Sequence, residues 1–478
     1  MTMANIGTGF SGIILLPLFT KFLGVNDYGL YIQVTVSISL IMSFVTLGLP
    51  YTTVRYLSAE KNRRIIQDDV YSTLTLVILF SILISIIFLI ISNKLAQLLF
   101  DGKTMVVIIL AFLFPIEAIL WTLLNLFRAF NEIKKFAIFS LIRTCSELLI
   151  LTLVILLGHG IVSILVVLLF FRTFLLVTTL LYTISYLGIV LPKFARMKDY
   201  LKFSLPTIPG NIAAWITDSS DRYLISIYLG TLFVGYYNPG YSLGSIISML
   251  MIPINFVLVS SLSKYYDNNK IDVIENIFKY SIKYFLILAI PASFGLSILS
   301  LPILELLTTS EIANMCYLVT PLIAFSSLFY CIGGGIIFFS LYLTKRTGIL
   351  MIIWVLVACL NFILNILFIP IMGILGAALA TLISQLFGFI YGTFYSYKYF
   401  NFRIEYLSIL KSIISSTIMA ALINSSLLNI SIFSDTVEII FKIIIGIVVY
   451  LILIVSLGTL NAEEVSFLKS LFHKSYSY

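Results

Sequence analysis

Charged side chains inside apolar segments are the residues of this sequence whose types could do chemistry. Arg172 lies near the middle of one apolar segment, and Glu117 and Glu147 lie equally deep in two others. A charge at the centre of a bilayer costs roughly 3 kcal/mol even on lenient scales, so each of these residues needs a partner or a watery cavity. Because no acid lies within one helical turn of Arg172, we expect its partner to be Glu117, Glu147 or an anionic substrate.

A second charged group, Asp218, Asp221 and Arg222, interrupts an apolar helical segment just ahead of a glycine turn. Asp218 and Arg222 are four residues apart. Arg143 and Glu147 have the same spacing. Side chains at this spacing share one face of a helix, where opposite charges can neutralise each other. For each pair the sequence leaves two interpretations open, a structural ion pair or a position facing a watery cavity.

The arginines could hold the phosphate groups of a substrate, because a guanidinium presents a planar fork of donors that matches phosphate oxygens. We expect Arg172 and Arg222 in a substrate cleft. Arg55, beside a basic cluster, fits either an anchor at the membrane interface or the inner mouth of that cleft. The acids could tune these cations or bind a coupling proton or sodium ion. The candidates for that role are Glu117, Glu147, Asp218 and Asp221.

The motifs of the common enzyme classes are missing from the sequence. It contains neither a nucleophile elbow nor a phosphate-binding loop, and its two histidines lie at a span end and in the tail. The four cysteines, Cys145, Cys316, Cys331 and Cys359, lack metal-ligand spacing and lie in or beside apolar segments. We therefore expect no catalysis, no metal, no cofactor and no disulfide.

The composition is that of an integral membrane protein. Hydrophobic residues make up 60% of the chain and charged residues 10%, with a mean hydropathy of +1.11. Soluble proteins contain about 25% charged residues. The net charge of +8 does not indicate nucleic-acid binding, because the basic residues lie in short loops between apolar segments. The first apolar segment has no basic leader and no A-x-A site, so we expect a retained span rather than a signal peptide.

Apolar segments of about 20 residues, long enough to span a bilayer as a helix, recur along the whole chain. Most of the 29 Lys and Arg residues lie in alternate loops, and this alternation predicts that both termini face the cytoplasm. We therefore expect an all-α, multi-pass protein of the plasma or inner membrane. Its fourteen predicted spans cover approximately residues 4–22, 29–54, 70–92, 104–126, 137–158, 161–188, 204–229, 235–260, 279–302, 313–340, 348–369, 374–396, 409–428 and 437–460.

The sequence contains an internal repeat with an offset of 206 residues. The segment FLGVNDYGLY aligns without gaps with YLGTLFVGYY, which matches Gly24 with Gly230 and Gly29 with Gly235. Since six predicted spans separate the two copies, both halves should have the same orientation, as in a parallel repeat. We expect two related lobes and then two extra transmembrane helices with a cytoplasmic tail, at residues 1–200, 201–400 and 401–478.

Several polar or helix-breaking residues are expected to bend or join the helices. Pro206, Pro209 and Gly334 are hinge candidates, because prolines and glycine runs weaken a helix where neighbours or a cavity satisfy the freed backbone groups. Close packing of helices explains the glycine run equally well. Asn361 and Asn365 share one face of a span, where they could join two helices by hydrogen bonds or bind a ligand.

Three stretches together carry a family resemblance. They are LPLFTKFLGVNDYGLYIQV with LGLPYTTVRYLS (residues 16–58), DRYLISIYLGTLFVGYY (221–237) and NILFIPIMGILGAALATLIS (365–384). In order and spacing they resemble the polysaccharide-flippase branch of the multidrug/oligosaccharidyl-lipid/polysaccharide exporter superfamily, the Wzx-type O-antigen flippases. The resemblance extends over nearly the whole chain.

This resemblance implies two six-helix lobes around a central cleft, two extra C-terminal helices and alternating access. It also implies transport of an oligosaccharide on a polyprenyl pyrophosphate from the inner to the outer leaflet, for the synthesis of O-antigen, lipopolysaccharide or capsule. The expected partners are this lipid-linked oligosaccharide, membrane lipids and a coupling proton or sodium ion. We expect a monomer, because the repeat already supplies two lobes.

Three alternatives to this function stay open. A multidrug or metabolite exporter of the same superfamily would carry cations, and a lipid II flippase would differ only in its cargo. A membrane-embedded glycan polymerase or ligase would be an enzyme with a long extracytoplasmic loop, whereas the loops here are short. Arg172 favours an anionic substrate over a cationic one.

Overall fold

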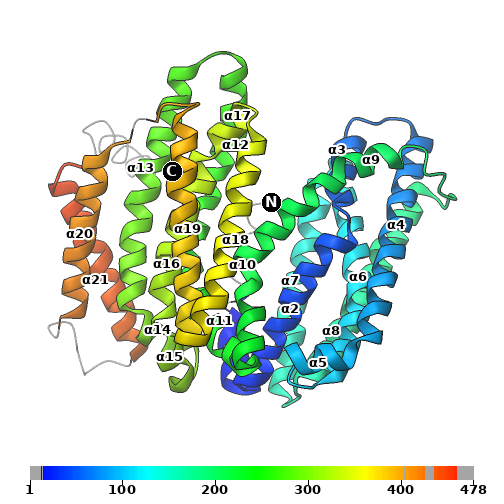
Figure 1. Ribbon diagram of the computed structural model, residues 1–478, viewed down its shortest axis with the longest axis horizontal. Helices are drawn as coiled ribbons and strands as arrows, with labels where there is room; N and C mark the ends of the chain where they lie inside the picture. The colour runs from blue at the N-terminus through cyan, green and yellow to red at the C-terminus, as the bar shows by residue number, and fades with distance from the viewer. Residues whose placement is uncertain (1–11, 13, 403, 426–434, 460–478) are drawn as a thin grey trace, which may run out of the picture. The chain divides into compact units, whose positions relative to one another are not determined.

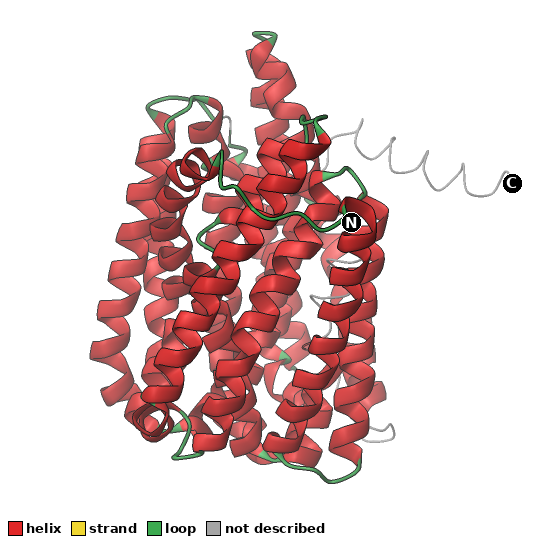
Figure 2. Cartoon of the chain, turned by 90° about the vertical axis from the view of Figure 1, so that its right-hand side faces the viewer, coloured by secondary structure: helices red, strands yellow, loops and turns green. Residues whose placement is uncertain are grey.

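The computed structural model describes residues 12, 14–402, 404–425 and 435–459, and the regular structure in these ranges is helical (Figure 1, Figure 2). Among the described residues, 11 helices are long and apolar enough to cross a membrane, by length and composition. This confirms the expected all-α, multi-pass fold class. The expected cytoplasmic tail and residues 4–11 and 13 of the first expected span lie outside the described residues.

The helices follow one another along the chain with short connections. Up to Ser245 they are η1 (Phe19–Leu23), α2 (Val25–Val45), α3 (Leu49–Leu57), α4 (Arg63–Ile90), α5 (Ser92–Leu99), α6 (Thr104–Ala129), α7 (Ile133–Leu156), α8 (Ile161–Leu187), α9 (Met197–Ser204), η2 (Leu205–Thr207), α10 (Ile208–Leu229) and α11 (Thr231–Ser245). After Ser245 they are η3 (Ile246–Leu250), α12 (Met251–Asp267), α13 (Ile271–Ile298), α14 (Ser300–Leu307), α15 (Ser310–Cys316), α16 (Val319–Tyr330), η4 (Cys331–Ile337), α17 (Phe339–Leu343), α18 (Thr347–Met372), α19 (Ile374–Tyr397), α20 (Tyr406–Asn424) and α21 (Asp435–Ser456).

Packing divides the chain into two compact units. The first takes in Met1–Pro239 and Trp354–Ser384, and the second takes in Gly240–Ile353 and Gln385–Tyr478. The lobes expected at residues 1–200 and 201–400 follow the sequence repeat rather than packing, and they stay a prediction.

Three of the expected spans are not among the long apolar helices. Of the first span, the described part is the short helix Ile14–Leu23. The seventh is α10, which is less apolar because it carries Asp218, Asp221 and Arg222. The eighth is broken by the 3-10 segment η3 just ahead of Pro253. A proline ring clashes with the carbonyl four residues earlier, which explains a break at this point.

Two more expected spans differ from the sequence prediction, one in its middle and one at its start. The second is divided into α2 and α3 by a turn in which Leu47 and Gly48 have φ values of 51° and 68°. The third begins at Arg63 rather than near residue 70, because the Asn62 side chain accepts a hydrogen bond from the Arg64 backbone N–H at 3.1 Å. A side-chain acceptor at this position satisfies a backbone donor that the first turn of a helix leaves unpaired.

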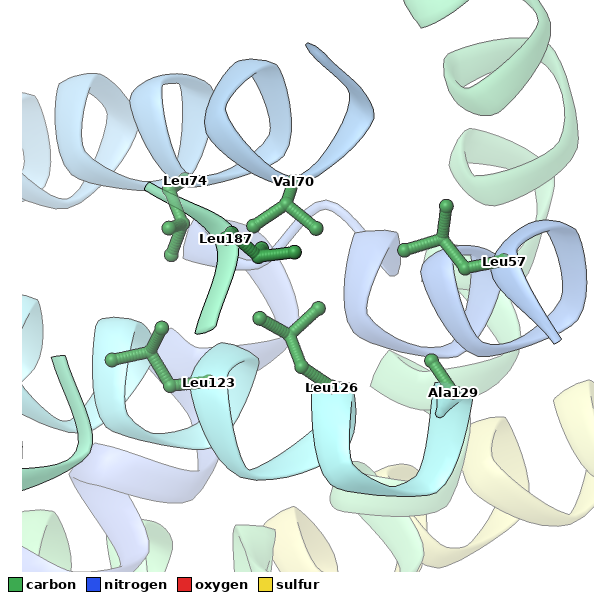
Figure 3. Close-up of a cluster of buried hydrophobic side chains, with 7 residues drawn as sticks. All are labelled: Leu57, Val70, Leu74, Leu123, Leu126, Ala129 and Leu187. Atoms are coloured by element: carbon green, nitrogen blue, oxygen red, sulfur yellow. The ribbon is translucent and has the colours of Figure 1, made fainter. Parts of the chain in front are cut away.

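A cluster of buried aliphatic side chains joins four helices of the first unit near the start of α4. Its members come from α3, α4, α6 and α8 and are Leu57, Val70, Leu74, Leu123, Leu126, Ala129 and Leu187 (Figure 3). In Figure 3 the side chains of α4 and α6 point toward one another. The cluster therefore fixes one end of α6 and α8, the helices that carry Glu117 and Arg172.

The repeated glycines meet in space inside the first unit. A Cβ atom on Gly29 of α2 would overlap the backbone carbonyl oxygen of Thr231, and one on Gly235 of α11 would overlap that of Val25. Thr231 follows Val25, and Gly235 follows Gly29, by the same 206 residues, so the sequence repeat relates the two contacts. The first turns of α2 and α11 thus pack backbone against backbone, which a larger residue would prevent.

The hinge candidates coincide with helix starts or irregular helix. Pro206 lies in the 3-10 segment η2, and Pro209 lies in the first turn of α10. Gly334 lies in the π-helical segment η4. These positions are compatible with bending, and the role of all three residues as hinges stays a prediction.

In the second unit, α20 packs along α13, and ion pairs join the two helices at one end. Lys279 and Lys283 of α13 lie 2.8 Å and 3.2 Å from the carboxylate of Glu405, the residue before α20. The Ser408 hydroxyl donates to the same carboxylate at 2.9 Å. Burial raises the pKa of Glu405, but the hydrogen bonds from Lys279, Ser408 and Lys283 outweigh this effect and lower the pKa to about 2.

We expect Glu405→Gln to lower the melting temperature at neutral pH, with a smaller effect in acid. A carboxylate whose pKa falls on folding stabilises the folded state above its ordinary pKa of about 4.3. This stabilisation is lost as the pH falls from there toward the folded-state value of about 2. Melting curves of both proteins across this range measure the difference. Glu305→Gln removes an exposed acid outside the described ion pairs and is the control. A constant difference at every pH would contradict the prediction.

Candidate functional site

Four charged side chains of α6, α7 and α8 form one ion-paired group, which we call the arginine–glutamate cluster. Arg172 Nη1 contacts Glu117 Oε1, and Arg172 Nη2 donates to Glu147 Oε2 at 2.8 Å. Arg143 Nη2 donates to the second oxygen of Glu117 at 3.0 Å. The two glutamates that were expected as possible partners of Arg172 therefore both bind it.

The sequence left open an ion pair between Arg143 and Glu147 on one face of α7. In the structure each of these residues takes its partner from another helix, Glu117 of α6 and Arg172 of α8. The spacing of four residues still has a consequence, because it places Arg143 and Glu147 on the same side of α7, facing the cluster.

The arginine–glutamate cluster has two positive and two negative groups, so its formal charge is zero. Arg172 and Glu117 are 6% and 3% exposed. The side chains of Arg143 and Glu147 are 26% and 20% exposed, so the cluster is accessible from the α7 side. Both Nη atoms of Arg172 are paired with glutamates in this arrangement, whereas its Nε has no hydrogen-bond partner among the described residues.

Arg222 is also buried, and its own helix holds it. Its Nη1 donates to the backbone carbonyl oxygen of Asp218 at 2.5 Å and to Asp221 Oδ1 at 2.9 Å. The Tyr237 hydroxyl of α11 donates to the other Asp221 oxygen at 2.6 Å, and the Arg222 guanidinium lies 5.6 Å from the centre of the Tyr237 ring. The carboxylate of Asp221, the preceding residue, thus binds Arg222, and the Asp218 side chain is exposed.

Arg55 lies at the end of α3 and is exposed. Its guanidinium lies 4.4 Å above the ring of Phe203 in α9. Within the part of the chain that the structure describes, Arg55 has no ion pair, unlike Arg172 and Arg222. Among the three arginines expected to bind substrate, Arg55 is therefore the one whose charge is not offset by a bonded acid.

The two asparagines of α18 form hydrogen bonds to the next helix. Asn361 Nδ2 lies 3.2 Å from Ser384 Oγ and 3.4 Å from Thr381 Oγ1, both in α19. Asn365 Nδ2 donates to Asn361 Oδ1 at 3.0 Å. These contacts favour the structural alternative, in which Asn361 and Asn365 join two helices.

A polar network that the sequence prediction missed lies where α4 begins. Arg196, the residue before α9, binds Asp69 of α4, and its Nη1 lies 2.9 Å from Glu60 Oε2. Hydrogen bonding to Asp69 raises the pKa of the Arg196 guanidinium above its usual value. The adjacent acids Asp68 and Asp69, just after a basic cluster, were the signal in the sequence. The Arg196 partner of Asp69 lies 127 residues later in the sequence, so residue spacing could not identify it.

Comparison with known proteins finds a matching family. The family described as polysaccharide biosynthesis protein matches residues 18–316, more than half of the chain. The "probable low-salt glycan biosynthesis flippase Agl15" of Haloferax volcanii is 25% identical over 235 residues, which are 48% of this chain and 49% of that protein. The chain thus matches about half the length of this curated relative.

Two solved structures share the fold. The lipid II flippase MurJ, in an inward closed conformation, matches with a TM-score of 0.80 at 20% identity, over 95% of this chain and 98% of that chain. An inward-facing multidrug resistance transporter of the MATE family, from the MOP superfamily, matches with a TM-score of 0.61 at 14% identity, over 82% and 94%. At these identities the likeness shows the fold alone.

Proposed function

The chain belongs to the polysaccharide biosynthesis protein family, and we propose that it is a flippase for a polyprenyl-pyrophosphate-linked oligosaccharide. It would move this lipid from the inner to the outer leaflet by alternating access. The observation that carries the proposal is Arg172, a buried cation in α8 that forms ion pairs with two glutamates. A pyrophosphate cannot cross hydrocarbon unaccompanied, so its carrier needs cations inside the membrane.

The neutral state of the arginine–glutamate cluster suggests how an ion gradient is coupled to binding. When Glu147 is protonated or binds a sodium ion, Arg172 Nη2 loses its acceptor, and the guanidinium becomes available to phosphate. Glu147 is the better candidate for this step, because 20% of its side chain is exposed compared with 4% for Glu117. Asp218 and Asp221 are the corresponding candidates beside Arg222. Exposed Arg55 would make the first contact with the pyrophosphate.

An apolar cavity in the second unit supports a lipid as the substrate. It has a volume of about 500 Å³ and lies among α13, α20 and α21. Carbon atoms make up nearly all of its wall, with Ile287, Pro291, Gly295, Met419, Ile443 and Ile447 among the lining residues. Such a wall suits the isoprenoid part of a lipid-linked sugar, and it offers almost no polar surface to a hydrophilic cation.

Flipping by the purified protein in liposomes tests the proposal. The substrate is a fluorescent polyprenyl-pyrophosphate oligosaccharide, and a cationic dye in the same vesicles is the alternative cargo. We expect the lipid to reach the other leaflet faster than in protein-free vesicles, with no movement of the dye. The same lipid without its pyrophosphate is the control for the role of the arginines. Dye movement without lipid flipping would overturn the proposal in favour of a multidrug or metabolite exporter.

A further inference from the structure

The segment between α8 and α9, residues 188–196, is bound to the start of α4, and we call it the linker. The carboxylate of Asp68 accepts hydrogen bonds from the backbone N–H groups of Lys193 and Ala195 at 2.5 Å and 3.2 Å. The Ser72 hydroxyl donates to the same carboxylate at 3.2 Å. Asp68 is therefore already occupied by groups of the protein and is a poor ligand for anything else.

The second acid beside the linker is occupied as well. Arg196 Nη2 binds Asp69 Oδ2, Arg196 Nε donates to Asp69 at 3.3 Å, and the Tyr200 hydroxyl donates to it at 2.8 Å. Arg196 Nη1 donates a hydrogen bond to Glu60 Oε2 at 2.9 Å. The acids near the linker thus have hydrogen-bond partners within the protein, and Arg196 offsets one of their negative charges.

A cavity of about 570 Å³ lies between the linker and the first turns of α4. The side chains of Arg64 and Lys193 line it, and both are exposed. Among the residues that the structure describes, neither side chain has an ion pair or hydrogen bond. The charged side chains that line the cavity are three cations, Arg64, Lys193 and Arg196, and two acids, Asp68 and Asp69. The lining therefore carries a net charge of +1, which would attract an anion.

The linker also exposes large apolar side chains next to this cavity. Ile189 and Leu191 are 79% and 85% exposed, and they follow directly after α8, one of the helices able to cross a membrane. The end of such a helix lies at the level of the lipid headgroups, where apolar side chains can enter the acyl region. The distribution of basic residues predicts that this end faces the cytoplasm.

We propose that the linker cavity binds the headgroup of an anionic phospholipid from the surrounding leaflet. Arg64 and Lys193 would hold its phosphate, while Ile189 and Leu191 would contact its acyl chains. A free phosphate would use the cations alone, so the exposed apolar pair favours a lipid. The bound lipid would hold the linker against α4 and so stabilise the connection between α8 and α9.

Lipid binding to the full-length protein in nanodiscs tests this proposal without any transport assay. The nanodiscs contain phosphatidylcholine alone or a mixture with phosphatidylglycerol, and native mass spectrometry counts the phosphatidylglycerol that stays bound. Each cation near an anionic lipid contributes a factor of about five to affinity. We therefore expect the double variant Arg64→Gln, Lys193→Gln to bind phosphatidylglycerol about 25-fold more weakly.

The matched control is the double variant Lys61→Gln, Lys198→Gln, which removes the same charge from exposed positions that do not line the cavity. It should keep nearly all of the binding, and an equal loss in both double variants would overturn the proposal in favour of a diffuse surface charge. A third variant, Ile189→Ser with Leu191→Ser, should weaken lipid binding while both cations remain.

Inorganic phosphate added to nanodiscs of phosphatidylcholine distinguishes the two sources of the anion. We expect it to leave the melting temperature of the protein unchanged, whereas phosphatidylglycerol raises it. If inorganic phosphate raised the melting temperature as much as phosphatidylglycerol, and only with Arg64 and Lys193 present, the site would bind phosphate, and the lipid proposal would be wrong. Because these measurements require no cargo, they are independent of the flippase assay.

Discussion

Arg172→Met is expected to destabilise the protein by about 3–5 kcal/mol and to abolish transport, because it breaks a buried ion pair and leaves the charge of its partner uncompensated. Without the guanidinium, the cluster keeps Glu117, Glu147 and only Arg143, so one buried negative charge remains. Thermal melting in detergent measures the first effect, and the liposome flipping assay measures the second. Arg128→Met is the control, because Arg128 donates to the neutral side chain of Asn125 at 3.0 Å.

A double variant distinguishes substrate binding by Arg172 from a purely structural role of this residue. The double variant Arg172→Met, Glu147→Gln restores the neutral charge of the cluster and leaves Arg143 paired with Glu117. We expect it to recover most of the melting temperature but none of the transport. If transport recovered together with stability, Arg172 would be a structural residue, and the proposed cationic site would have to rest on Arg55 and Arg222.

Gly235→Ala is expected to destabilise the first unit by about 3 kcal/mol, the upper end of the usual cost of overpacking. The added Cβ would overlap the backbone carbonyl oxygen of Val25, and a backbone atom cannot move aside as a flexible side chain can. Gly29→Ala should have a similar effect through Thr231. Chemical or thermal unfolding measures both. Gly210→Ala is the control, since a Cβ there would meet nothing within 4 Å.

The combination of the two glycine variants tests whether the repeated contacts act as one unit. Both contacts join the same first turns of α2 and α11, so the first substitution already separates the helices that the second would push apart. The double variant Gly29→Ala, Gly235→Ala should therefore cost less than the sum of the single variants, because neighbouring sites are not additive. Simple additivity would show that the two glycines act independently.

The family resemblance inferred from three motifs is confirmed by the match to residues 18–316, and the all-α membrane fold is confirmed by the described helices. Both were predictable because they depend on local features of the sequence. An apolar segment of about 20 residues must form a helix in a bilayer, since no water is present to satisfy its backbone groups. The turn that divides the second span was missed, although Gly48 marked its place.

The spacing of residues in the sequence could not identify the ion-pair partners of the charged residues. The sequence indicated that Arg172 needs an acid, and it left Glu117, Glu147 and a substrate as equal choices. Only the packing of α6 and α7 against α8 places both glutamates in ion pairs with Arg172 and pairs Arg143 with Glu117. The binding roles of these residues, and of Arg222 and Arg55, stay predictions that the variants above test.

By itself, the sequence determined that the chain crosses a membrane as helices, that it repeats after 206 residues and which residues carry charge into the apolar segments. The tertiary structure alone decided that the repeated glycines touch, that the arginine–glutamate cluster is neutral and that the linker binds α4. The physical reason is the range of each interaction. Hydropathy and turn preference act over neighbouring residues, whereas an ion pair or a glycine contact depends on which helix faces meet after packing.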